Sequence, residues 1–294
     1  MYILSKRKLY TYLSPQTITL LKLSVFFIFL GLFLQYIFWK IPLADVLVTK
    51  DLMEPIVSKV SSLTWNEYLE SDFVGKASAI YPMVVGWIFL ILAFISVLLN
   101  HRSSRGSSFL IFGTLLILLH LLILYLSSDL AWHLFFKNAT MFATPLLLNA
   151  ALFSNMRDRR FIGWVRVVLA VTFIFHGINA IGFFQIPESY LYMIEQTLFL
   201  DHQTATQFLF VIGVIDIIVG VFVLIPMKIK FFLYYMVFWG LMTALARPVA
   251  YFDGSEFFPA MASSFYDFLV RLPNVILPLM IISLQRYYKR RFLR

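Results

Sequence analysis

The sequence contains no cysteine, and this absence excludes disulfide bonds, thiol redox chemistry and thiolate-ligated metal or iron–sulfur sites. Charge is also scarce, because only 13% of the residues are charged, against about 25% in an average soluble domain. Hydrophobic residues instead make up 61% of the 294 positions. A water-soluble core of this length could not bury so much apolar surface, so the composition predicts a membrane protein.

Long apolar runs separate short polar connections along the chain. A spanning helix needs about 20 mostly apolar residues, because the hydrocarbon layer is about 30 Å thick and each residue rises about 1.5 Å. A membrane β-barrel would instead show segments of about ten residues that alternate in polarity. We therefore predict an all-α polytopic membrane protein with about eight transmembrane helices. The predicted spans are residues 17–39, 80–99, 108–127, 139–155, 164–184, 207–225, 231–247 and 269–285.

Basic residues concentrate in alternate connections, whereas the connection 185–207 contains Glu188, Glu195 and Asp201 and no lysine or arginine. By the positive-inside rule, the basic side is cytoplasmic, which predicts an inner-membrane protein with both termini in the cytoplasm. The net charge of +9 is then a topology signal that also suits the lipid bilayer, and we expect no nucleic-acid partner. The residues on the basic side are Lys6, Arg7, Lys8, Lys22, Arg102, Arg105, Arg157, Arg159, Arg160, Arg166, Lys228, Lys230, Arg286, Lys289, Arg290, Arg291 and Arg294.

Landmarks in the first half of the chain recur in the same order in the second half. FIFLG at 27–31 matches FIFHG at 173–177, and WKIP at 39–42 matches FQIP at 184–187. We therefore predict a duplicated four-helix unit, with one copy at 1–156 and the other at 157–294. Because four is even, the two four-helix bundles are related in parallel. The first copy carries Leu30 where the second has His176, and it contains an outer segment, 43–79, that we interpret as interfacial.

Polar residues inside the predicted spans indicate a candidate site in the second copy, because ionisable groups in a bilayer usually face the bundle interior or a cavity. Thr172, His176 and Asn179 share one helix face, and Asp216 lies between two glycines on the next helix. Both His176 and Asp216 are predicted near the middle of the membrane, where the two side chains could form a hydrogen bond.

Further polar residues near the outer ends of the last helices would complete an outward-facing pocket. They are Arg247, Arg271 and Asn274, with Asp253, Glu256 and Asp267 in the connecting loop. A structural role stays open for each group. His176 and Asp216 could serve only packing, and the arginines could snorkel to lipid headgroups.

Several of these residues carry a resemblance to a known family. They are Arg166, the pair His176-Gly177, the helix from Gly213, ALARP at 244–248 and RLPN at 271–274. Over roughly residues 160–290, the chain resembles the DoxX-like family of four-helix membrane proteins. The resemblance implies a four-helix unit and a link to quinone-dependent or other membrane redox complexes.

The sequence shows none of the HExxH, GxSxG or P-loop signatures, so we assign no catalytic and no metal-binding residue. The first functional hypothesis is an accessory or ligand-binding subunit that holds a lipid or quinone and serves a membrane redox or export complex with partner proteins. A second hypothesis is a proton-coupled carrier that uses Asp216 and His176. A third is a quinone-linked oxidoreductase, which would need a redox centre that this sequence does not visibly supply.

Overall fold

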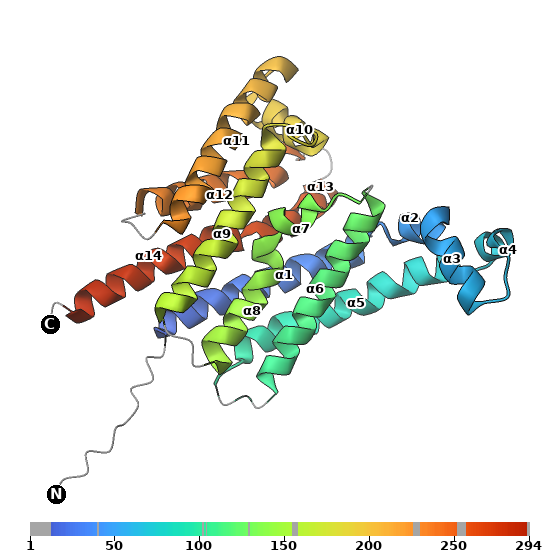
Figure 1. Cartoon of the computed structure of the whole chain (residues 1–294), viewed down its shortest axis with the longest axis horizontal. Helices are drawn as coiled ribbons and strands as arrows, with labels where there is room; N and C mark the ends of the chain where they lie inside the picture. The colour runs from blue at the N-terminus through green and yellow to red at the C-terminus, as the bar shows by residue number, and fades with distance from the viewer. Residues whose placement is uncertain are drawn as a thin grey trace, which may run out of the picture.

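The computed structural model describes residues 13–39, 41–101, 103, 105–128, 130–154, 158–225, 230–251 and 257–292. Within these ranges the chain is helical and contains no strand (Figure 1). The longer helices are α1 (Pro15–Phe38), α5 (Phe73–Leu98), α6 (Gly106–Ser127), α8 (Ala139–Phe153), α9 (Asp158–Ala180), α11 (His202–Leu224), α12 (Lys230–Ala250), α13 (Phe257–Arg271) and α14 (Pro273–Phe292). The shorter helices are α2 (Leu43–Val48), α3 (Lys50–Val60), α4 (Trp65–Glu70), α7 (His133–Lys137) and α10 (Glu188–Leu198).

Seven apolar helical segments in the described ranges are long enough to cross a bilayer, which confirms the all-α polytopic fold. The predicted span 139–155 corresponds to α8, which is apolar but only 15 residues long. The last apolar segment, Ser264–Gln285, runs across a break at Leu272 between α13 and α14. Pro273 opens α14 because proline lacks the N–H that a helix interior needs but fits its first turn.

The long helices pair antiparallel in the same pattern in both halves of the chain. α1 packs on α5 and α6 on α8, while α9 packs on α11 and α12 on α14. The halves meet where α1 packs against α13 and α14, and where α7 and α8 pack against α9 (Figure 1). The first and second long helices pair in each half, and so do the third and fourth, as a repeated four-helix unit would require. The duplication itself and the boundary at 156 stay predictions.

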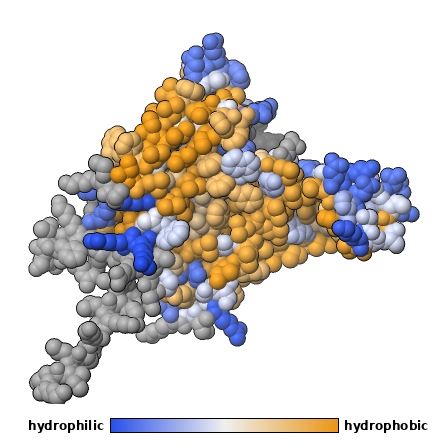
Figure 2. Space-filling model, in the orientation of Figure 1, coloured by the Kyte–Doolittle hydropathy of each residue, from blue (hydrophilic) through white to orange (hydrophobic). Residues whose placement is uncertain are grey.

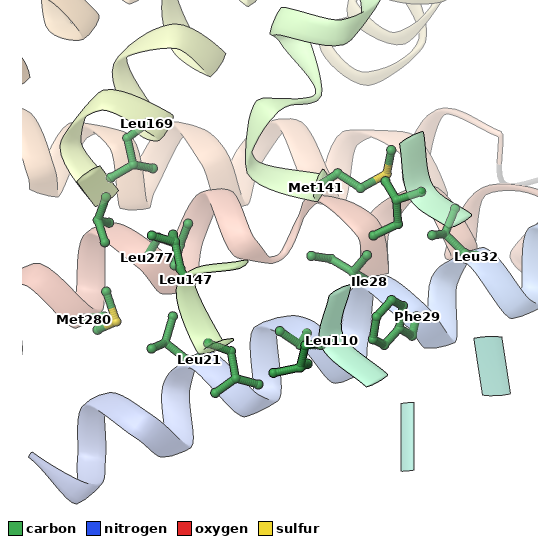
Figure 3. Packing of buried hydrophobic residues seen from close by; sticks show 14 of the residues in the cluster. Leu21, Ile28, Phe29, Leu32, Leu110, Met141, Leu147, Leu169, Leu277 and Met280 are labelled. Atoms are coloured by element: carbon green, nitrogen blue, oxygen red, sulfur yellow. The ribbon is translucent and has the colours of Figure 1, made fainter. Parts of the chain in front are cut away.

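The core lies between α1 and the helices that surround it. Figure 3 shows Leu21 of α1 close to Met280 of α14, and Ile28 and Phe29, farther along α1, on the side of Leu110 of α6. All five side chains are almost fully buried. In a bilayer, tight packing of this kind holds helices together, because lipid tails are as apolar as the side chains themselves.

The outer surface is apolar over the long helices, and polar residues gather on α2–α4 (Figure 2). The predicted outer segment, 43–79, contains these three short helices. It is shorter than expected, because α5 begins at Phe73. A capping box opens α4 at the surface, because the Thr64 hydroxyl accepts a hydrogen bond from the Glu67 N–H and the Glu67 carboxylate accepts one from the Thr64 N–H.

The orientation of the chain in the membrane stays a prediction. Of the basic residues on which it depends, Lys6, Arg7, Lys8, Arg102, Arg157, Lys228 and Arg294 lie outside the described residues. The side chains at positions 286–291 are likewise outside the described part.

Candidate functional site

Five of the six predicted site residues line a single pocket in the second half of the chain. It lies between α9, α10, α11, α12 and the α13–α14 junction. Its empty volume, which includes the solvent at its open side, is about 710 Å³. The predicted residues that line it are His176, Asp216, Arg247, Arg271 and Asn274.

The wall of the pocket between its polar groups is apolar. It is formed mainly by Phe173, Ala180, Met193, Ile194, Leu209 and Ile212. Pockets that bind small molecules typically combine such a wall with a few convergent polar groups. The site can therefore accommodate an apolar chain or ring whose polar group is held at one end.

The charged end of the pocket is built around Asp267. The Nε of Arg271 donates a hydrogen bond to Asp267 Oδ1 over 3.1 Å, and Arg247 forms an ion pair with Asp267 Oδ2. Asp267 was predicted in a loop, but it lies on α13, one turn before Arg271. The side chains of Arg247 and Arg271 are only 9% and 15% exposed, so neither arginine snorkels to the surface.

His176 is held in one tautomer by its two neighbours. Its Nδ1 lies 2.9 Å from the carbonyl oxygen of Thr172, and its Nε2 lies 3.0 Å from the Nη1 of Arg271. A carbonyl oxygen can only accept and a guanidinium can only donate. Nδ1 therefore carries the proton and Nε2 accepts, which is the arrangement of a neutral imidazole.

Asp216 and His176 do not form the hydrogen bond that their predicted depths allowed. Asp216 Oδ1 accepts from the Tyr235 hydroxyl at 2.9 Å, and Oδ2 accepts from Trp239 Nε1 at 3.3 Å. Both donors lie on α12, four residues apart, so they reach the carboxylate from one helix face. His176 lies one turn from the end of α9 at Ala180, and its depth near the middle of the membrane stays a prediction.

Asn274 links the pocket to the first half of the chain. Its Oδ1 accepts a hydrogen bond from the Thr140 hydroxyl at 2.6 Å, and the Thr140 N–H donates to Thr172 Oγ1 at 3.1 Å. The Thr172 side chain thus satisfies one of the free N–H groups at the start of α8. Sequence reasoning missed Thr140, because nothing in its spacing links it to residues 32 and 134 positions away.

Asn179 does not line the pocket. It is fully buried, and neither its side-chain nitrogen nor its side-chain oxygen has a hydrogen-bond partner among the described residues.

The predicted loop acids Asp253 and Glu256 lie outside the described residues. His120, in the first half, lies 5.5 Å from Tyr36 between ring centroids, and both are buried.

Lys137, at the end of α7, adds a third cation near the charged end. Burial of the ammonium group is the largest cause that lowers the pKa of this lysine, to about 8. The positive charges of Arg271 and Arg247 lower the pKa further, and the carboxylate of Asp267 raises it. Lys137 lies outside the seven apolar segments and was not among the predicted site residues. Its position just before a short apolar helix is the one sequence signal that could have suggested it.

The fold and the pocket define a multi-pass helical membrane protein with a buried polar cluster in its second half. No family model, curated protein or solved structure matches the chain. The resemblance to the DoxX-like family is therefore an expectation that rests on the residues quoted for it.

Proposed function

We propose that the chain binds an amphiphile, of lipid or quinone type, in the pocket of its second half. The observation that carries this proposal is a largely apolar pocket with Arg247, Arg271 and His176 at one end and Asp216 on its wall. A headgroup or a quinone oxygen can accept hydrogen bonds from the arginines while the apolar part lies along α9 and α11. This supports a ligand-binding role more directly than a catalytic one.

The wider role of the chain follows from its resemblance to DoxX-like proteins. On that basis we propose an accessory subunit in the inner membrane that serves a redox or export complex.

Filling the pocket is expected to remove the bound molecule. Ala246 lines the pocket on α12, and Ala246→Phe would place an aromatic ring in its space. We expect the amount of lipid or quinone that copurifies in mild detergent to fall by about tenfold or more, because the ring and the ligand cannot share the volume. Mass spectrometry of extracts from equal amounts of folded protein measures this change.

The matched control is Val249→Phe on the same helix. Val249 is 60% exposed on the outer surface, so the added ring would meet lipid and not the pocket. This variant should retain the bound molecule. Equal ligand content in both variants, or no small molecule in the unaltered protein, would contradict the proposed function.

A proton-coupled carrier is the second candidate, because Asp216 and His176 line the same pocket even though they do not bond to each other. In this case Asp216→Asn should abolish the dependence of transport on a pH gradient, since the amide cannot exchange a proton. Reconstituted liposomes with an imposed gradient provide the measurement. Uptake that is the same in both proteins would remove this mechanism.

A further inference from the structure

The charges at the charged end of the pocket, around Asp267, do not balance among the described residues. Arg247 and Arg271 line the pocket and Lys137 lies close to both, whereas Asp267 is the carboxylate that pairs with them. Both Asp267 oxygens are engaged, one by each arginine. His176 is neutral, so it does not change this balance. The described groups thus leave positive charge at the end of an apolar pocket.

Two buried donors at this end have no acceptor among the described residues. The Nε of Arg247 has no hydrogen-bond partner among the described residues, and the hydroxyl of Tyr190, which lies beside the guanidinium of Arg271, has no acceptor there for its own O–H, although each residue is only 8% exposed. Both residues line the pocket. Leaving a buried donor unsatisfied costs free energy, and more for a charged group, so these donors favour an acceptor within the pocket.

The acceptor that fits these groups is an anion. A guanidinium presents several N–H donors in a planar fork that matches carboxylate and phosphate oxygens. A neutral acceptor would satisfy the hydrogen bonds but would leave the excess charge uncompensated in a surrounding of low dielectric. A cation would be repelled, because the carboxylate of Asp267 already pairs with both arginines.

We propose that Arg247, Arg271 and Tyr190 form a binding site for the acidic headgroup, a carboxylate or phosphate, of the amphiphile that occupies the pocket. This inference rests on the proposed function and names the chemistry of the ligand. Lys137 stands at the edge of the site and adds long-range attraction. The apolar part of the ligand lies against the wall formed by α9, α10 and α11.

Two probes with the same alkyl tail test which headgroup the site binds. Dodecyl phosphate and dodecanol share a slender twelve-carbon tail and differ in the head, which is an anionic phosphate in the first and a neutral hydroxyl in the second. With the purified full-length chain in a neutral detergent, we expect dodecyl phosphate to bind about tenfold or more tightly than dodecanol, because charge-assisted hydrogen bonds are the stronger ones. Binding of ³²P-labelled dodecyl phosphate, with competition by dodecanol, gives both affinities.

Variants of the protein show which side chains contribute to the binding of dodecyl phosphate. Arg247→Gln and Arg271→Gln should each weaken dodecyl phosphate binding by about tenfold or more and leave dodecanol binding unchanged. Because these changes also disturb the ion pairs of Asp267, Tyr190→Phe and Lys137→Gln serve as milder variants that retain them. Tyr190→Phe should weaken dodecyl phosphate binding by about fivefold, the effect of one hydrogen bond. Arg166→Gln, at a partly buried arginine of α9 outside the pocket, should change neither affinity.

Inorganic phosphate separates a lipid headgroup from a free anion. If dodecyl phosphate binds and inorganic phosphate does not displace it, the anion belongs to an amphiphile. If inorganic phosphate binds with the same dependence on Arg247 while neither amphiphile binds, the anion site stands and the proposed amphiphile function fails. If dodecanol binds as tightly as dodecyl phosphate, or if Tyr190→Phe and Lys137→Gln change nothing, the headgroup assignment is wrong and amphiphile binding stands. If none of the three probes binds, both are wrong.

Discussion

Replacing Asp267 by asparagine is expected to lower the free energy of unfolding by about 3 kcal/mol. The carboxylate pairs with Arg247 and Arg271 at once, so the variant leaves two guanidinium groups close together without a counter-charge among the described residues. Removing one partner of a buried ion pair typically costs about 3–5 kcal/mol. The lower end applies, because the Asp267 side chain is 26% exposed. Unfolding by a graded denaturing detergent, followed by circular dichroism, measures the change.

Two controls show whether the loss comes from burial and charge. Glu54→Gln removes an exposed pair with Lys50, whose side chains are 48% and 60% exposed, and should cost less than about 1 kcal/mol. The double variant Asp267→Asn with Arg247→Gln should be more stable than Asp267→Asn alone. The second change removes the guanidinium charge of Arg247, which the first change left without its carboxylate. If Asp267→Asn costs no more than Glu54→Gln, the cluster does not stabilise the fold.

The positions of the helices were predictable from the sequence because a bilayer leaves few alternatives. Backbone polar groups in hydrocarbon must be satisfied within the segment, so each long apolar run has to be a helix. The ends were less predictable. α11 begins at His202 and not at residue 207, because the side chain of Asp201 accepts hydrogen bonds from the N–H groups of Gln203 and Thr204. Such capping residues extend a helix into polar sequence that hydropathy alone excludes.

The site was predictable as a set of residues but not as a set of contacts. Burial of an ionisable group in an apolar span signals a pocket, and five of the six predicted residues do line one. Depth along a helix gives the height of a side chain but not the neighbour that it faces. Depth alone could not show that the carboxylate of Asp216 accepts a hydrogen bond from Tyr235 on α12, or that His176 accepts one from Arg271. The tyrosine and tryptophan donors were overlooked because neutral aromatic residues are common throughout this chain.

Replacing Gly177 by alanine is expected to destabilise the protein by about 3 kcal/mol, the upper end for overpacking. A Cβ at Gly177 would collide with the backbone carbonyl of Gly213, and it would lie 2.8 Å from the side chain of Ile217. A Cβ at Gly213 would in turn lie 2.8 Å from the carbonyl oxygen of Gly177. The nearest obstacle at each position is backbone or a branched side chain, so α9 and α11 would have to separate. Thermal unfolding in detergent measures the loss of stability.

Gly163→Ala on the same helix is the matched control. A Cβ at Gly163 would meet nothing within 4 Å, so alanine there should be neutral or should stabilise α9 by up to about 1 kcal/mol through its helix propensity. Equal stability of the two variants would contradict the close contact of α9 with α11. His176 and Asp216 line the pocket from these two helices, so a separation that destabilises the fold should also widen the pocket. Gly177→Ala is therefore expected to weaken the binding of dodecyl phosphate as well, whereas Gly163→Ala should leave it unchanged.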